Sequence, residues 1–132
     1  MNKEFIPYEQ ALALKELGFD EPCFANYDDD GKLTNGNYTI KQKLIYLVDY
    51  SRINITLLAP LYQQAFRWFR EKHNIDGLLH KTVEGSYYFW ITECEYENYN
   101  HYKYYNQMVY FNTYEEAELA CLIKLIKIVK KK

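Results

Sequence analysis

The segment TYEEAELACLIKLIKIV, residues 113–129, decides the fold class because it reads as one long amphipathic helix. Thr113 stands three residues before Glu116, the spacing of a capping box, in which each residue satisfies a backbone N–H of the other. Glutamates occupy the first turn and lysines the last, as the helix dipole favours. The apolar positions recur at helical spacing and form a wide stripe: Ala117, Cys121, Leu122, Leu125, Ile126, Ile128 and Val129. We therefore expect this helix to pack centrally on a β-sheet.

The sheet is predicted from the residues that precede this helix. Residues 78–83 and 87–94 read as two strands joined by the turn Glu84-Gly85-Ser86. In the second strand Tyr87, Phe89 and Ile91 face one side and Tyr88, Trp90 and Thr92 the other. Because both faces are apolar or amphipathic, we expect a central strand. A polar connection over residues 95–103 leads to a further predicted strand over residues 104–111.

Two more helices are predicted in the first half of the chain. The first covers residues 7–17: Pro7 suits a helix start, and Gly18 suits the left-handed residue that closes a helix, with Phe19 folding back on the last turn. The second covers residues 60–73 and ends at Asn74. It places Trp68 and Phe69 on its apolar face.

The remaining segments predict short strands and turns. Residues 22–33 read as a hairpin around a two-residue Asp30-Gly31 turn, and residues 34–38 as a loop. Residues 40–50 suit a strand or a short helix, and we favour the strand. Together these elements predict an α+β fold: a single compact domain over residues 1–132, with a mostly antiparallel sheet of four to six strands covered on one face by three helices.

Composition excludes several classes of protein. A formal net charge of -2 makes general nucleic-acid binding unlikely, since such proteins carry a basic excess. No apolar run is long enough to cross a bilayer, and the start of the chain carries no signal peptide, so we expect a cytoplasmic protein without a membrane partner. The three cysteines are widely separated, which indicates reduced thiols. We expect no cofactor and no bound metal.

The candidate metal-binding and thiol motifs in the sequence are weak, which supports the expectation of no bound metal. Residues 26–33 resemble the first half of a calcium loop, but Asn37 stands where a bidentate glutamate belongs, so we interpret them as a solvated acidic hairpin tip. His73, His80, His101 and Cys94 have no spacing that places three zinc ligands on one element. The thiolate of Cys94 is disfavoured by its two glutamate neighbours, and Cys121 lies on the core stripe.

The first candidate site is the pair Arg67 and Arg70, with Gln63 one turn earlier, in a chain in which lysine outnumbers arginine 13 to 3. A guanidinium binds phosphate or carboxylate more specifically than an ammonium does. The alternative is a solvated helix face on which Arg67 pairs with Glu71.

The second candidate site is a cluster of tyrosines. Nine of the fifteen tyrosines fall between Tyr87 and Tyr114, more aromatic surface than one small sheet can bury. Exposed tyrosine is a common recognition surface, and we single out Tyr99, Tyr102 and Tyr104 as partner-binding residues. The alternative is codon bias, because Asn, Ile, Lys and Tyr share A/T-rich codons and all are plentiful.

Three stretches carry a resemblance: YEQALALKELGF (residues 8–19), QAFRWFREK (64–72) and TYEEAELACL (113–122). They resemble the signature stretches of a family of small uncharacterised proteins frequent in phages and prophages of Bacteroides-like bacteria. The resemblance covers about a quarter of the chain. It implies a phage context and a compact α/β fold, and it implies no activity.

The expected function is binding without catalysis. The first hypothesis is a phage accessory protein in the host bacterial cytoplasm that counters host defence, by sequestering a small nucleotide or by occluding a host protein. The second is a structural or assembly protein that forms a homo-oligomer through its tyrosine-rich face. A small enzyme of unrecognised chemistry is a third alternative.

Overall fold

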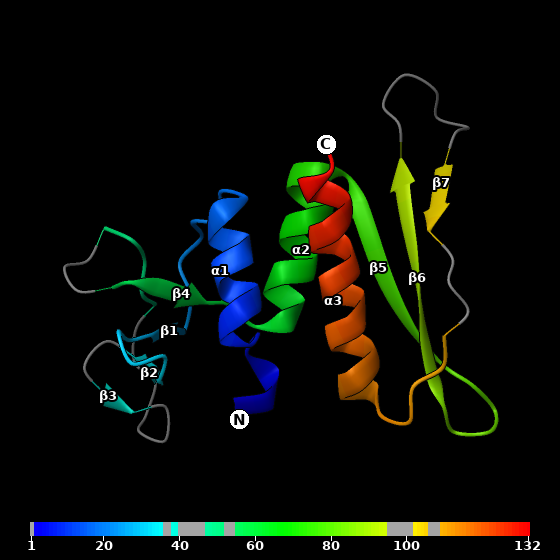
Figure 1. Ribbon diagram of the computed structural model, residues 1–132, viewed down its shortest axis with the longest axis horizontal. Coiled ribbons are helices and arrows are strands. Elements are labelled where there is room, and N and C mark those ends of the chain that lie inside the picture. Colours follow the sequence, from blue (N-terminus) through cyan, green and yellow to red (C-terminus); the bar gives the residue numbers. More distant parts are fainter. Residues whose placement is uncertain (1, 36–37, 40–46, 52–54, 95–101, 106–108) are drawn as a thin grey trace. The chain divides into compact units, whose positions relative to one another are not determined.

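The computed structural model describes residues 2–35, 38–39, 47–51, 55–94, 102–105 and 109–132 (Figure 1). Its contacts divide the chain into two compact units, Met1–Gln64 and Ala65–Lys132, and each is described by itself. The α+β class, with three α-helices and antiparallel strands, is confirmed. The expectation of a single domain stays a prediction. Where the sequence predicted one sheet, the described strands form two.

The described residues form a short 3-10 helix, three α-helices and seven strands. Their bounds are η1 (Asn2–Glu4), α1 (Tyr8–Glu16), β1 (Ala25–Tyr27), β2 (Leu33–Asn35), β3 (Tyr38–Thr39), β4 (Leu57–Ala59), α2 (Tyr62–His73), β5 (Ile75–Lys81), β6 (Tyr87–Cys94), β7 (Tyr102–Tyr105) and α3 (Tyr114–Lys130). Within the described ranges, no helix combines the length and apolar character needed to cross a bilayer.

The first unit contains a four-stranded antiparallel sheet in the order β3-β2-β1-β4, with α1 against β4. The predicted end of α1 is confirmed: Gly18 has φ +98°, and the Phe19 N–H donates to the Leu14 oxygen at 2.9 Å. Phe19 and Leu14 are buried. The phenol of Tyr27 donates to the Ile6 oxygen at 2.6 Å inside this core.

The predicted β1–β2 hairpin forms, but the prediction of a two-residue turn is wrong. The Asp28 N–H donates to the Lys32 oxygen and the Gly31 N–H to the Asp28 oxygen, so residues 29–31 make a three-residue loop. Only Gly31 in this loop has positive φ, whereas a type I′ two-residue turn, in which Asp30 and Gly31 would be the central residues, needs it at both of them. The Asp28 carboxylate accepts the N–H groups of Asp30 and Lys32, as in an acidic hairpin tip that caps its own backbone.

The predicted loop over residues 34–38 is also different in the structure. Thr34 and Asn35 belong to β2, and Tyr38 opens β3. Asn35 is buried, and its amide donates to the Phe24 oxygen at 2.5 Å. This hydrogen bond satisfies the buried amide and compensates for the low strand propensity of asparagine. Of the predicted strand over residues 40–50, residues 40–46 lie outside the described part of the chain. Val48 pairs with Cys23 in a single antiparallel bridge.

The second unit contains the antiparallel sheet β5-β6-β7, with α3 packed on β5 and β6 (Figure 1). The predicted stripe of α3 is buried along its whole length, and β6 is the central strand, as expected. Phe89 and Ile91 on β6 are buried on the helix-covered face. The sequence-based prediction of this core is confirmed.

The termini of the elements differ from the predictions by a few residues. Helix α2 begins at Tyr62 instead of Pro60, and its core residues Trp68 and Phe69 are buried as predicted. Asn74 ends the helix with φ +55°, and the chain enters β5 directly at residue 75, three residues earlier than expected. Strand β7 covers residues 102–105, two residues earlier than expected, and residues 106–108 lie outside the described ranges.

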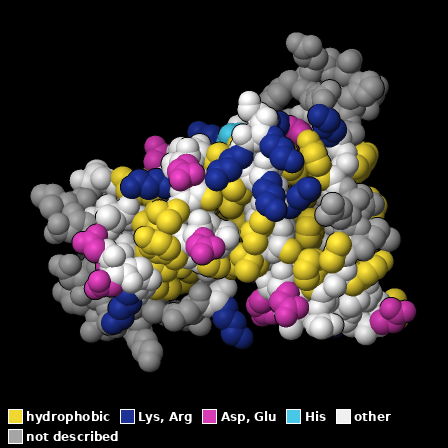
Figure 2. Space-filling model, in the orientation of Figure 1, with side chains coloured by type: hydrophobic (Ala, Val, Ile, Leu, Met, Phe, Trp, Pro, Cys, Tyr) yellow, Lys and Arg dark blue, Asp and Glu magenta, His cyan; other side chains and the backbone are white. Residues whose placement is uncertain are grey.

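The Thr113 half of the predicted capping box and the predicted charge pattern of α3 are both present. The Thr113 hydroxyl accepts the Glu116 N–H at 3.2 Å. Glutamates stand in the first turn of α3 and lysines in its last turn. Figure 2 shows Lys and Arg side chains gathered over the C-terminal half of this helix, where the dipole favours positive charge.

Candidate functional site on the outer face of the three-stranded sheet

The candidate site lies on the face of the β5-β6-β7 sheet that points away from α3. Gly77 faces α3, since a Cβ built on it would come within 2.6 Å of Cys121 Sγ. Side chains alternate along a strand, so the neighbours of Gly77 and their cross-strand partners project to the opposite side. We call this side the outer face; it carries Asp76, Leu78, His80, Tyr88, Trp90, Thr92, Cys94 and Tyr104.

Aromatic rings cover much of the outer face. His80 stacks on its cross-strand neighbour Tyr88, with ring centroids 5.1 Å apart, and meets Trp90 edge to face at 6.4 Å. Tyr88 also contacts Tyr110, 5.8 Å away. Tyr104 and Tyr110 are 61% and 53% exposed, and Leu78 is 48% exposed. Large apolar side chains that remain this open on a sheet face are typical of a binding surface.

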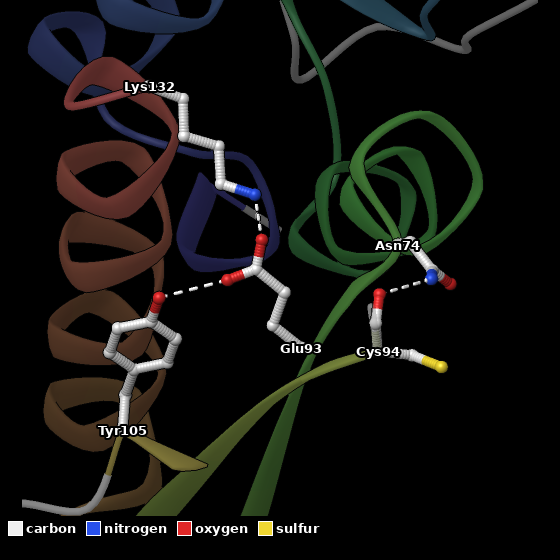
Figure 3. Close-up of polar contacts among 5 residues, drawn as sticks. All are labelled: Asn74, Glu93, Cys94, Tyr105 and Lys132. Atoms are coloured by element: carbon white, nitrogen blue, oxygen red, sulfur yellow. Dashed lines mark hydrogen bonds and ion pairs between the residues drawn. The ribbon is translucent and has the colours of Figure 1, made fainter. Parts of the chain in front are cut away.

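A cavity of about 220 Å³ opens where α2 passes into β5. Its lining residues are Arg70, Asn74, Ile75, Asp76, Thr92 and Cys94. Asn74 holds the two sides of the cavity together: its side-chain amide donates to the Cys94 oxygen at 2.7 Å (Figure 3). Its backbone carbonyl accepts the Cys94 N–H at 3.2 Å. The left-handed backbone of Asn74 is thus part of the cavity wall.

Asp76 is the unusual residue of this cavity. Its Oδ1 atom is shielded from solvent and accepts no hydrogen bond from any described residue. Arg70 Nη1 lies 3.7 Å away, close enough for an ion pair and too far for a hydrogen bond. On the same face Trp90 Nε1 is a shielded donor that likewise has no acceptor among the described residues. Buried polar atoms are nearly always satisfied, so these two atoms are exceptions among the described residues.

The opposite face of the sheet holds a separate polar cluster around Glu93. Tyr105 donates to Glu93 Oε2 at 2.9 Å, and the Lys132 ammonium pairs with Oε1 (Figure 3). Burial lowers the pKa of His73, and the charge of Lys132 lowers it further. Glu93 is 5% exposed. Since both carboxylate oxygens are engaged, this cluster stabilises the unit and does not offer a binding site.

The structure separates the residues that the sequence singled out. Gln63, Arg67 and Arg70 are exposed on α2 as predicted, and of the three Arg70 lines the cavity. Its partner is Asp76, the second residue of β5, which the sequence did not single out. Tyr104 lies exposed on the outer face. Tyr99 and the side chain of Tyr102 lie outside the described residues.

The sequence missed the cavity because the predicted start of β5 was three residues late. Because β5 begins at residue 75 and side chains along a strand alternate between the two faces of the sheet, Asp76 lies on the same face as Thr92 and Trp90. A strand predicted to begin at residue 75 would have placed the Asp76 carboxylate beside Arg70. The signal was Asn74, a residue that tolerates positive φ and can connect a helix to a strand without a loop.

The cysteines do not form a reactive centre with these residues. Burial raises the pKa of the Cys23 and Cys121 thiols to about 12, with Glu21 adding to the effect at Cys23 and Asp76 at Cys121. Cys94 is half-buried in the cavity wall. Across the described segments, no three His, Cys, Asp or Glu side chains are grouped so that they could hold a metal ion.

Comparison with known proteins finds no matching family model, no matching curated protein and no matching solved structure. The resemblance to a phage and prophage family stays a prediction from the sequence.

Proposed function

We propose that this protein is a binding protein that sequesters a small nucleotide on the outer face of its three-stranded sheet. The observation that carries the proposal is the continuity of two features on one face: the open aromatic surface, and the cavity that contains the ion pair of Arg70 and Asp76. Sequestration needs tight binding and no chemical step, so the proposal requires no catalytic residue.

The aromatic surface supports a ligand with a planar ring. Bases stack on aromatic side chains of exposed sheets with little regard to sequence, and each stack contributes about 1–3 kcal/mol. Tyr104 is the cross-strand partner of Thr92, and Trp90 is the next outer-face residue along β6. Both rings therefore stand beside the cavity wall. Exposed Arg67, one turn before Arg70 on α2, adds a guanidinium suited to phosphate.

The predicted phage context gives this binding a purpose. A phage protein in the host cytoplasm that holds a signalling nucleotide would counter a defence system that depends on that nucleotide. This part of the proposal rests on the sequence resemblance and on the fact that sequestration requires no catalytic step.

A second candidate function is self-association through the same face. The exposed Leu78, Tyr104 and Tyr110 would be buried in a dimer, and interface cores are enriched in tyrosine. The paired charges of Arg70 and Asp76 favour the small-ligand proposal, because a dimer interface over them would have to remove both charges from water, which costs free energy.

The experiment that tests the proposal measures nucleotide binding to the whole chain by isothermal titration calorimetry, with Tyr104→Ser as the variant. We expect binding by the native protein and a loss of about tenfold or more in the variant, because the stacking surface is removed. The matched control is Tyr114→Ser, a tyrosine on α3 that is 44% exposed and off the outer face. Equal losses in both variants, or no binding of any nucleotide, would overturn the proposal.

Sedimentation of the same proteins separates the second candidate. A concentration-dependent dimer that Tyr104→Ser dissociates and Tyr114→Ser does not would assign the outer face to self-association. A monomer at all concentrations would exclude that function.

A further inference from the structure

We propose that Glu93, Tyr105 and Lys132 form a latch that holds the edge strand β7 in place on the sheet. The inference goes beyond nucleotide binding and does not depend on it. It rests on three observations: the burial of the Glu93 carboxylate, the two partners that hold it, and the position of β7 at the edge of the sheet.

The Glu93 carboxylate needs both of its partners. Glu93 is 5% exposed, and an ionised carboxylate removed from water is stable only when opposite charge and hydrogen-bond donors replace that water. The Tyr105 phenol supplies a donor at Oε2, and the Lys132 ammonium supplies positive charge at Oε1 (Figure 3). Since the two partners engage different oxygens, the loss of either leaves one oxygen of a buried anion without compensation.

The two partners belong to different parts of the second unit. Lys132 follows α3, which ends at Lys130, whereas Tyr105 is the last residue of β7. Glu93 stands between them on the central strand β6. The latch therefore connects the end of α3 to β7 through a single carboxylate.

Strand β7 is the part of the sheet that most needs such a connection. It has four residues, and among the described strands it pairs with β6 alone. Helix α3 packs on β5 and β6. A short strand at a sheet edge opens locally at a low cost in free energy, because few contacts are lost. When β7 opens, water reaches Glu93 and the carboxylate no longer needs Lys132, so the ion pair favours the closed strand.

The latch also bears on the outer face of the sheet. Tyr104 stands next to Tyr105 on β7 and projects to the opposite side, because side chains alternate along a strand. Opening of β7 would move Tyr104 away from Thr92, its cross-strand partner on β6. The cluster around Glu93 thus fixes, from the helix-covered face, the strand that presents Tyr104 on the other.

The alternative cation for Glu93 is Lys103. It is the cross-strand partner of Glu93 in the pairing of β6 with β7, and it is exposed. The ion pair that the structure forms with Glu93 is that of Lys132. The latch therefore predicts a larger effect from the loss of the charge at Lys132 than from its loss at Lys103.

The test is hydrogen exchange of the β7 amides, followed by NMR on the whole chain. Lys132→Met keeps an unbranched side chain of similar length and removes its charge. We expect it to speed the exchange of these amides by about tenfold or more, because interactions with a charged group contribute this much to keeping a structure closed. Lys103→Met should change the rates by less than about threefold, as is usual for an exposed charge. Lys132→Arg keeps the positive charge and should preserve the native rates.

Gly77→Ala separates the latch from a general loss of stability. Its added methyl group strains the contact between β5 and α3, and this strain persists when β7 alone opens. The β7 amides should therefore exchange within about threefold of the native rates in this variant. Equal acceleration in Gly77→Ala and Lys132→Met, or in Lys103→Met and Lys132→Met, would overturn the latch. Native rates in Lys132→Met would overturn it as well, and this half-exposed side chain can be changed without loss of the fold.

Discussion

Gly77 of β5 and Cys121 of α3 approach so closely that a Cβ on residue 77 would come within 2.6 Å of the sulfur. Leu125 would lie 3.3 Å from the same Cβ, so the helix leaves no room for a methyl group. We expect Gly77→Ala to lower the free energy of unfolding by about 1–3 kcal/mol through overpacking. Urea denaturation followed by circular dichroism measures this change.

A second substitution on the facing helix tests the cause. Cys121→Ala shortens the side chain that residue 77 would strike, so Gly77→Ala combined with Cys121→Ala should lose less stability than the two single losses added together. Contacting residues couple by about 0.5–3 kcal/mol in such cycles. Strict additivity would show that the close approach of Gly77 to Cys121 is not what limits residue 77.

The hydrogen bond from Tyr105 to Glu93 should be measurable in stability. Tyr105→Phe removes the 2.9 Å bond and leaves one oxygen of a buried carboxylate without its donor. Hydrogen bonds to charged groups contribute about 1.5–3 kcal/mol, so we expect a loss in this range. Tyr110→Phe, a change to a phenol that is 53% exposed, is the matched control and should cost less than about 0.5 kcal/mol. Similar losses for both variants would contradict the role given to Glu93.

The sequence predicted correctly those elements in which the local sequence pattern agrees with the residues that the structure buries. In α3 the cap at Thr113, the apolar stripe and the charge pattern all indicate the same helix, and every stripe residue is buried. In β6 the alternation of side chains matched the sheet because the strand is paired on both edges. Gly18 and Asn74 ended their helices because both residue types tolerate positive φ.

The features that sequence missed depend on particular side-chain contacts and on strand pairing. Asp28 folds its carboxylate over the following backbone, which selects a three-residue loop over the expected two-residue turn. Arg70 was predicted from its residue type, yet its partner Asp76 became visible only with the true start of β5. The division of the strands into two sheets is set by pairing such as β1 with β4, residues far apart in the chain, and no local pattern encodes that choice.

Glu118 should make the stability of the protein depend on pH. Burial and, to a smaller extent, the charge of Glu115 raise the pKa of this glutamate from 4.5 to about 7. Between pH 4.5 and 7 the folded state binds more protons than the unfolded state, so stability falls as pH rises through this window. Glu118→Gln should therefore stabilise at pH 8 by about 1 kcal/mol or less, since the half-exposed side chain is screened by solvent.

Thermal unfolding of Glu118→Gln at pH 4 and pH 8 measures that dependence. The variant should gain stability at pH 8 and little at pH 4, where both states of the native protein are protonated. Glu84→Gln, a change at an exposed turn, serves as the control and should leave the difference between the two pH values unchanged. An equal gain for Glu118→Gln at both pH values would assign the effect to packing and contradict the pKa shift.

The three thiols should differ sharply in reactivity. Cys23 and Cys121 are buried with pKa values of about 12, so at pH 8 almost none of either is present as the reactive thiolate. Cys94, half-buried in the cavity wall, is the most accessible of the three. With a disulfide reagent such as dithionitrobenzoate at pH 8, we expect one thiol to react quickly and two to react only when denaturant unfolds the chain.

Cys94→Ser should abolish the fast phase, whereas Cys121→Ser should keep it. Two fast thiols in the native protein would show that the core around Cys23 or the core around Cys121 opens readily. A melting temperature that falls on adding reducing agent would contradict the assignment of all three cysteines as free thiols.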